Sequence, residues 1–541
     1  MKSIIVTSAL PYANGEIHLG HIASTYLPAD IFVRYCRLNS YNTIFTCATD
    51  DFGTPILIKA EKEHKSPKDY VAHWYNQDKE DFERLGISFD IFDQTSSKEN
   101  IEFVRYVFNR LYNNNYIYEK DVIQFYCEYD KKFLPDRYVI GTCPYCGAND
   151  QYSDICEQCS RIPEQILDPK CAICGNTPVN RVSKHYFFKL SAFSSRLKEW
   201  LNTNKNLQSD IKNYVLRWIE DGLKDWDITR DISWGVPIPL NEEQVLYGWF
   251  DNHLCYISAT LKYLNNKVDD PKLFWNNSII YHFIGKDIIY HHYLFLPAIR
   301  MGIEEEYKLP DFIPTRGHLM LAKQKISKSR NWYISLKDFL DVYPPDYLRF
   351  YIASIVSYSQ EDLNFDWDEF ASKINNELIA NIGNFINRAL TFASKKFNGI
   401  VPEYTDLDSL DRAIIDEINK IGDEVGSLIF SNEIDKGLRR ILSFSNTLNQ
   451  YFQAKEPWSD QLKAKNCIYI SINAVRSLAV LLSPYIPFSS SNICKQLNID
   501  EIDRWNPSEL LIRPNHKLGV IKPLFKKIEN DEIEKQKKRL G

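Results

Sequence analysis

The strongest constraint on the fold is a strand–helix–strand pattern at the N-terminus that returns late in the chain. Residues 3–9 form an apolar, strand-like run, and a helical pattern extends from residue 16 to about residue 38. A second apolar run, residues 43–48, ends at Asp50-Asp51, as a parallel strand does when it carries polar groups to its carboxyl edge. A strand-like apolar run followed by a helical pattern occurs again at residues 278–301. We therefore expect a doubly wound α/β fold whose parallel sheet is assembled from two separate segments.

The segment between these two halves has a different character. From residue 116 to about 222, paired cysteines, prolines and glycines replace long periodic runs, which indicates an inserted module. Beyond residue 345, apolar residues recur with a helical period, which predicts an α-helical bundle. The expected units are the first half of the α/β domain at 1–115, the insertion at 116–222, the second half at 223–310, a connecting region at 311–345 and the bundle at 346–541.

Length and charge fit this division. A chain of 541 residues predicts three to four domains at about 150 residues each. The net charge of -6 means that any nucleic-acid partner must be held by local basic patches.

No window reaches the ~18 uninterrupted apolar residues that a membrane-spanning helix needs, and the N-terminal run lacks the form of a signal peptide. We expect a cytoplasmic protein without a membrane partner, in which clustered cysteines bind metal.

Two CxxC pairs dominate the insertion. Nine residues separate Cys143-Pro-Tyr-Cys146 from Cys156-Glu-Gln-Cys159, and this spacing lets four thiolates converge on one tetrahedral Zn²⁺. A third pair, Cys171 and Cys174, needs partners from elsewhere. The remaining cysteines are unpaired in the sequence and are expected as small core residues at positions 36, 47, 255, 467 and 494.

A pair of histidines marks the start of the first predicted helix. His18 and His21 are three residues apart, so both rings project from one face beside backbone N–H groups that have no helical partner. Helix N-termini attract phosphate, and Gly20 leaves room for a close approach. Two ordinary surface histidines would give the same four residues, His18-Leu-Gly-His21.

A second candidate phosphate site lies far downstream. In Lys325-Ile-Ser-Lys328-Ser329 two lysines three residues apart alternate with hydroxyl groups, an arrangement that can hold and release a leaving polyphosphate. Alone, this run is also typical of a solvated loop. The order of an early HLGH, a late KISKS and a helical C-terminal third is characteristic of class I aminoacyl-tRNA synthetases, whose catalytic domain is a split Rossmann-type sheet.

Within that class, the chain resembles the methionyl-tRNA synthetase family over essentially its whole length. The segments that carry the resemblance are Ala9–Gly15 before HLGH, Gly53–Ile56, Phe133–Arg137, Gly141–Pro144, Trp226–Asp231, His282–Asp287, the KISKS segment and Pro457-Trp458.

The resemblance implies a two-step reaction. The carboxylate of L-methionine attacks the α-phosphorus of ATP to give methionyl adenylate and pyrophosphate, with Mg²⁺ on the phosphates, and a terminal hydroxyl of tRNA(Met) then takes the acyl group. His18 and His21 would contact ATP together with Gly20, Gly285, Asp287 and Ser327, while Lys325 and Lys328 would stabilise the departing pyrophosphate. Asp50 would hold the ammonium group. The methionine side chain would lie among Ala9, Leu10, Tyr12, Trp226, Trp249, Tyr256, Ile288, His292 and Phe295.

The chain departs from the family pattern beside this pocket. Asn252 and His253 replace alanine and proline, Phe52 stands where a histidine is common, and His291 stands where an aromatic residue is common. We hypothesise a modified pocket wall with methionine still preferred. Structural histidines with satisfied hydrogen bonds are the alternative reading of His253 and His291.

The resemblance also bears on the third cysteine pair. Two-zinc members of the family carry a CxxC before the Phe133–Arg137 segment, and here that place reads Cys127-Glu-Tyr-Asp130. A carboxylate can ligate zinc, so Cys127, Asp130, Cys171 and Cys174 either make a second site or form an empty, degenerate knuckle.

In the helical third, Asn384, Arg388 and Trp458 match the positions with which the family reads the CAU anticodon, and splayed bases stack on aromatic faces in such sites. Trp458 could equally anchor a helix start. No appended dimerisation domain is evident, so a monomer is expected.

Three other classes of protein share some of these sequence features. Another class I synthetase, for a bulky aliphatic amino acid, would need a larger editing insertion than residues 116–222. A catalytically silent RNA-binding paralogue would have no use for HLGH, Asp50 and both KISKS lysines. A small nucleotidyltransferase would be much shorter.

Overall fold

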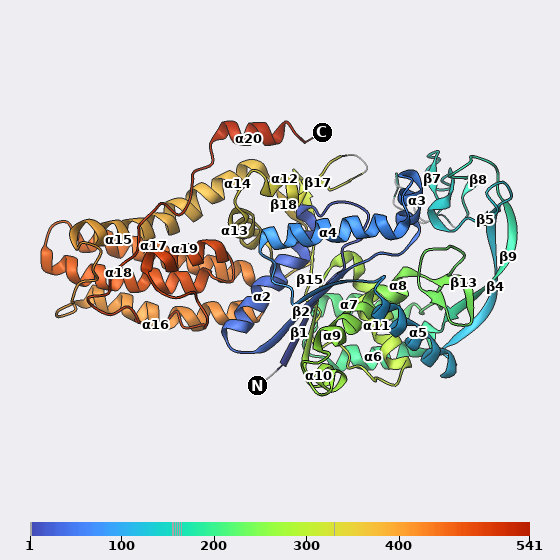
Figure 1. Cartoon of the computed structure of the whole chain (residues 1–541), viewed down its shortest axis with the longest axis horizontal. Helices are drawn as coiled ribbons and strands as arrows, with labels where there is room; N and C mark the ends of the chain where they lie inside the picture. The colour runs from blue at the N-terminus through green and yellow to red at the C-terminus, as the bar shows by residue number, and fades with distance from the viewer. Residues whose placement is uncertain are drawn as a thin grey trace.

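The structure is a computed structural model that describes residues 3–153, 156, 158–159, 161, 163, 165–328 and 331–540. The molecule is elongated, with the helical bundle at one end, the cysteine-rich insertion at the other and the parallel sheet between them (Figure 1). The two sequence-distant halves of the α/β domain therefore meet in the middle of the molecule.

The central sheet has five strands in the order β15-β14-β1-β2-β3, and every neighbouring pair is parallel. Its strands are β1 (Ser3–Ser8), β2 (Asn42–Thr49), β3 (Ile91–Gln94), β14 (Ile279–Gly285) and β15 (Thr315–Arg316). The halves join where β1 pairs with β14, with Ile5 opposite Ile280. Both residues are fully buried, so one core holds two segments that lie more than 270 residues apart in the sequence. The predicted split parallel sheet is confirmed.

The helix after β1 begins later than its periodicity predicts. Helix α1 (Leu19–His21) runs through a π-helical turn (Ile22–Tyr26) into α2 (Leu27–Leu38), whereas the sequence pattern places the start at residue 16. The backbone before Leu19 is extended because it pairs with a distant segment: Leu336 donates to the Ile17 carbonyl, and Leu19 donates to the Ile334 carbonyl. Tertiary pairing thus delays the start of the helix by about one turn and fixes where His18 lies.

Further helices pack on the α/β domain. They are α3 (Thr54–Lys62), α4 (Pro67–Leu85), α5 (Lys98–Asn113), α9 (Cys255–Leu264), α10 (Pro271–Asn277) and α11 (Leu296–Gly302). The late strand–helix segment at residues 278–301 contains a second π-helical turn, His291–Phe295, just before α11. π-Helical turns of this kind concentrate at functional sites.

The insertion is built on a long antiparallel pair. Strand β4 (Ile117–Cys127) pairs with β9 (Val179–Phe188) over ten residue pairs. Short strands follow at its far end, namely β5 (Lys132–Phe133), β6 (Val139–Thr142), β7 (Gln151–Tyr152) and β8 (Leu167–Cys171), and helices α6 (Ser194–Thr203) and α7 (Ser209–Glu220) return the chain to the sheet.

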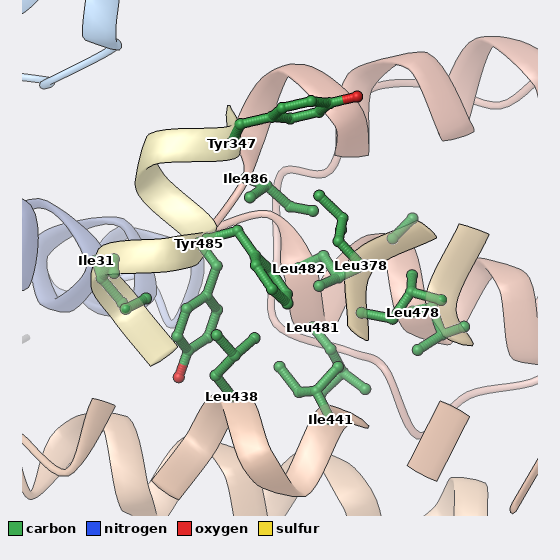
Figure 2. Packing of buried hydrophobic residues seen from close by; sticks show 14 of the residues in the cluster. Ile31, Tyr347, Leu378, Leu438, Ile441, Leu478, Leu481, Leu482, Tyr485 and Ile486 are labelled. Carbon is green, nitrogen blue, oxygen red and sulfur yellow. The ribbon is translucent and has the colours of Figure 1, made fainter. Parts of the chain in front are cut away.

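The C-terminal third is helical, as its period predicts. After α13 (Pro345–Ile355) come α14 (Trp367–Lys373), a π-helical stretch (Ile374–Gly383), α15 (Asn384–Lys396), α16 (Ser409–Phe430), α17 (Ile434–Lys455), α18 (Gln461–Leu482) and α19 (Pro487–Leu497). Leu438 and Ile441 of α17 face Leu478 and Leu481 of α18 across the core, with Tyr485 beyond them (Figure 2). Ile31 of α2 belongs to the same buried cluster, so the bundle shares its core with the α/β domain.

Among the described residues, none of the helices has both the length and the apolar character that crossing a membrane requires. The cysteines at 36, 47, 255, 467 and 494 are buried, as expected of small core residues.

Candidate active site

A cavity of about 440 Å³ lies between the carboxyl edge of the sheet, the start of α1 and the KISKS segment. Ten residues that the sequence singles out line it: Ala9, Leu10, Tyr12, His18, Gly20, His21, Gly285, Asp287, Ile288 and Lys325. They come from both halves of the split domain, and β1 and β14 lie side by side beneath them. The fold thus unites motifs that are about 300 residues apart.

The two histidines form a stacked pair at this cavity. Their ring centroids are 3.7 Å apart, and the backbone N–H of His18 donates to Nδ1 of His21. Burial, followed by the nearby Lys328 ammonium, lowers the pKa of His18 to about 3, and burial also lowers the pKa of His21 well below its usual value. Both rings are therefore neutral at pH 7, able to donate a hydrogen bond to a phosphate without carrying a charge.

Gly20 lets the KISKS segment approach the histidines. A Cβ atom at this position would lie 3.0 Å from the His18 ring and 3.1 Å from the side chain of Ile326. Both distances are tighter than ordinary van der Waals contact, so a larger residue would push the two motifs apart. The glycine is required by packing as well as by access to the cavity.

The two lysines of KISKS occupy different environments. Lys325 is exposed and lines the cavity, whereas Lys328 is half-buried, and its Nζ atom would lie 3.3 Å from a Cβ at Gly15. Burial lowers the pKa of Lys328 to about 8. Ser327 does not line the cavity, and the last residue of the motif, Ser329, lies outside the described residues.

Among the cavity residues that the sequence interpretation missed, His318 contacts a predicted site residue. His318 lines the cavity, and its Nε2 atom lies 3.1 Å from a carboxylate oxygen of Asp287. The sequence gives little indication of this role: His318 follows Gly317 just after the short strand β15 and belongs to no motif. The contact helps to lower the pKa of Asp287, where burial alone would raise it, so this carboxylate stays ionised.

Asp50 lies at the edge of the same region, beside Tyr12, with which it forms an isolated parallel bridge. Its Oδ2 atom accepts a hydrogen bond from Asn252 at 3.2 Å, while its Oδ1 atom is buried without a partner among the described residues. Burial raises the pKa of Asp50 to about 7. A buried carboxylate with one free oxygen is suited to a cationic ligand, which would restore its ordinary ionisation.

An aromatic group adjoins Asp50. Trp226 stacks on Trp249 with centroids 5.3 Å apart and packs against Phe295 at 4.6 Å. His292 links Tyr256 to the cavity residue Ile288: its Nδ1 atom donates to the carbonyl oxygen of Ile288, and its Nε2 atom accepts from the hydroxyl of Tyr256 at 3.0 Å. Of the ten residues expected around an amino-acid substrate, four line the cavity itself: Ala9, Leu10, Tyr12 and Ile288.

The insertion contains two clusters with metal-ligand geometry. The sulfur atoms of Cys143, Cys146, Cys156 and Cys159 lie within 4.8 Å of one another, and so do the ligand atoms of Cys127, Asp130, Cys171 and Cys174. In the second cluster, one carboxylate oxygen of Asp130 is 3.1 Å from the sulfurs of both Cys127 and Cys171. Four soft or anionic donors at these separations match a tetrahedral Zn²⁺ site.

A groove of about 760 Å³ runs between the π-helical stretch, α15 and α17 of the bundle. Asn384 and Arg388 line it and bond to Asn449 and Gln453, respectively, at 3.0 and 3.2 Å. Trp458 does not line this groove but follows α17, and 51% of its surface is exposed. An exposed tryptophan beside an amide-rich groove provides a stacking surface with hydrogen-bonding groups next to it.

Comparison with known proteins places this architecture in a family. Residues 4–390 match the family of class I tRNA synthetases (M), and residues 401–541 match the anticodon-binding domain of methionyl tRNA ligase. The methionine–tRNA ligase of Pyrococcus furiosus is 43% identical over 98% of this chain and 76% of its own length. That of Methanobrevibacter smithii is 42% identical over 100% of this chain and 82% of its own.

The fold also matches a solved structure. The methionyl-tRNA synthetase of Mycobacterium tuberculosis, crystallised with methionyl-adenylate, superposes with a TM-score of 0.80 and 22% identity, covering 97% of this chain and 100% of that one. The split sheet, the stacked HLGH histidines beside a KISKS lysine and the full-length sequence similarity agree, and the chain belongs to the methionine–tRNA ligase family of class I aminoacyl-tRNA synthetases.

Proposed function

We propose that this chain activates L-methionine with ATP and transfers it to tRNA(Met) with a CAU anticodon. The observation that carries the proposal is the meeting of the two nucleotide motifs at one cavity, with Asp50 at its edge. A binding protein would have no need to bury a carboxylate with one free oxygen next to a phosphate-binding helix start. The full-length similarity to methionine–tRNA ligases supports methionine as the amino acid.

In this proposal Asp50 holds the ammonium group of methionine. The thioether lies against the aromatic group of Trp226, Trp249 and Phe295, where sulfur-to-ring contacts contribute about 0.3 to 1.5 kcal/mol each. The remaining contacts come from Ala9, Leu10, Tyr12, Tyr256, Ile288 and His292. With the ammonium and side chain fixed, the methionine carboxylate is directed at the nucleotide.

The nucleotide is held by His18, Gly20, His21, Gly285 and Asp287, the last on a ribose hydroxyl. Lys325 and Lys328 stabilise the charge that develops on pyrophosphate as it leaves, with Ser327 and a Mg²⁺ ion on the phosphates. No protein nucleophile takes part, so the rate depends on positioning and on preorganised charge.

We assign Zn²⁺ to both cysteine clusters as a structural ion. The donor sets fit, because the sulfur and carboxylate atoms of each cluster are within 4.8 Å of one another. Zn²⁺ supplies folding free energy to such loop-rich segments and takes no part in the reaction.

For the tRNA, we assign Asn384, Arg388 and Trp458 to the anticodon. The segments 1–115, 116–222, 223–310, 311–345 and 346–541 then act as catalytic first half, zinc insertion, catalytic second half, connecting region and anticodon-binding domain. The active form is a cytoplasmic monomer in this proposal.

The test is charging of two tRNA transcripts that differ only in their anticodon, CAU or CAG, with radiolabelled methionine. The proposal expects methionine on the CAU transcript and about 5- to 150-fold less on the other, since the one base that differs loses contacts that contribute about 1 to 3 kcal/mol. Equal charging of both would refute the anticodon assignment, and charging of neither, with intact adenylate formation, would refute transfer to tRNA(Met).

A further inference from the structure

Two imidazoles lie within the aromatic group that adjoins Asp50. The ring of His291 meets Trp249 edge-on with centroids 3.6 Å apart and Trp226 edge-on at 5.7 Å. The ring of His253 meets Phe295 edge-on at 5.8 Å. The wall that the aromatic residues form therefore carries polar nitrogen atoms as well.

Hydrogen bonds fix the orientation of His253. Asn252 donates from Nδ2 to the Oδ2 atom of Asp50 at 3.2 Å, and its Oδ1 atom lies 3.2 Å from Nδ1 of His253. When Asp50 is ionised it can only accept, so the amide nitrogen must face it and the amide oxygen must face the imidazole. His253 then carries its proton on Nδ1, and its Nε2 atom presents a lone pair.

Neither His253 Nε2 nor His291 Nε2 has a hydrogen-bond partner among the described residues. Both side chains are buried, with residue exposures of 2% and 4%. The neighbouring His292 differs, because it bonds through both nitrogens, to Ile288 and Tyr256. Unpaired buried polar atoms are rare in folded proteins, and an ordered water or a ligand atom supplies the partner that the protein does not.

The two rings are also neutral. Burial lowers the pKa of both His253 and His291 well below the usual value of histidine. A neutral imidazole offers one donor and one acceptor, so a group that both donates and accepts, such as a hydroxyl or a carboxamide, matches the pair. A purely apolar side chain leaves both nitrogens unsatisfied.

We propose that His253 and His291 make the side-chain end of the amino-acid pocket hydrogen-bonding, so that it accepts an unbranched amino acid with a terminal hydroxyl or carboxamide alongside methionine. This inference rests on the proposed methionine site. Within that site, the lone pair of His253 and the ring nitrogen of His291 determine which terminal group of the amino-acid side chain is accepted.

The experiment compares two isosteric amino acids in ATP–pyrophosphate exchange with the full chain. Norleucine ends in a methyl group, and 5-hydroxynorvaline ends in a hydroxyl at the same position. The kcat/KM ratio of hydroxynorvaline to norleucine is measured in the wild type, in His253→Phe, in His291→Phe and in His253→Gln, which restores a hydrogen-bonding group. His73→Phe, an exposed substitution on α4, is the matched control.

The ratio is expected to fall at least about tenfold in each phenylalanine variant, to recover at least partly in His253→Gln and to stay at the wild-type value in His73→Phe. An unchanged ratio in both phenylalanine variants, with methionine still activated, would overturn this inference and leave the proposed function intact. If methionine itself supports no exchange in the wild type, the proposed function fails instead.

Discussion

The Nε2 atom of His185 lies 2.8 Å from a carboxylate oxygen of Asp231, and the Nδ1 atom of the same ring lies 2.6 Å from Asp227. His185 belongs to β9 of the insertion. Asp227 directly follows Trp226 in the sequence, and Asp231 lies four residues further on. Gln124 also donates to Asp231, at 2.7 Å. One buried imidazole thus connects the insertion to the segment that begins at Trp226.

This contact predicts a pH-dependent local stability. Burial would lower the pKa of His185, but the hydrogen bonds and charges of Asp227 and Asp231 raise it from 6.5 to about 9. The raised pKa stabilises the folded state fully below about pH 6.5, and this contribution is lost as the pH rises through about 9. Its size is about 3 kcal/mol at pH 6, since each pKa unit corresponds to about 1.4 kcal/mol.

Hydrogen exchange of the backbone amides of residues 179–188 measures this pH-dependent stabilisation. At pH 6, His185→Gln should lower the local opening free energy by that amount, which corresponds to roughly 150-fold faster exchange after correction for the intrinsic rate. At pH 9.5 the two proteins should differ little. A difference that stays the same at both pH values would contradict a charged His185.

Lys328 is predicted to act on the transition state of adenylate formation. Lys328→Ala should lower kcat of ATP–pyrophosphate exchange by about 100- to 1,000-fold, because a preorganised positive charge at the leaving phosphate is removed. KM for methionine should change little. The matched control is Lys323→Ala, an exposed lysine in the same segment, which should keep wild-type activity. Equal losses in both variants would show that the segment, and not the charge of Lys328, matters.

The second cysteine cluster predicts two zinc ions per chain. Metal analysis should give two for the wild type, one for Cys171→Ser and two for Cys255→Ser, a buried cysteine outside both clusters. Asp130→Cys should keep both ions, because a thiolate is an equivalent ligand. One zinc per chain in the wild type, unchanged by Cys171→Ser, would show that the second cluster is an empty knuckle.

Trp458 is predicted to stack on an anticodon base. Trp458→Ala should raise KM for tRNA by about 5- to 150-fold, since base–aromatic stacking contributes about 1 to 3 kcal/mol, and leave adenylate formation unchanged. Tyr404→Ala, another half-exposed aromatic substitution in the bundle, serves as the control and should spare both steps. Equal loss of both steps in Trp458→Ala would indicate a folding defect.

Much of the architecture follows from local pattern. The apolar runs at residues 3–9 and 43–48 predict β1 and β2 to within two residues, since a buried parallel strand needs a continuous apolar run. The CxxC spacing likewise predicts the cluster of Cys143 and its partners, because zinc ligation imposes local geometry. These features depend on few long-range contacts.

Other features depend on contacts between residues that are far apart in the sequence, and no local pattern predicts such contacts. The His185 network joins side chains from β4, β9 and the segment after Trp226, and neither its register nor its burial is visible in a one-dimensional pattern. His318 meets Asp287 only once β14 and β15 lie side by side. The late start of α1 has the same origin, because pairing with residues 334–336 overrides the helical period.

Activation of methionine by this chain is measured by ATP–pyrophosphate exchange with each of the twenty standard amino acids. We expect methionine to give the highest kcat/KM and Asp50→Asn to remove most of that activity, because the ammonium group loses its counter-charge. A higher kcat/KM for another amino acid, or no exchange with any of the twenty, would contradict this expectation.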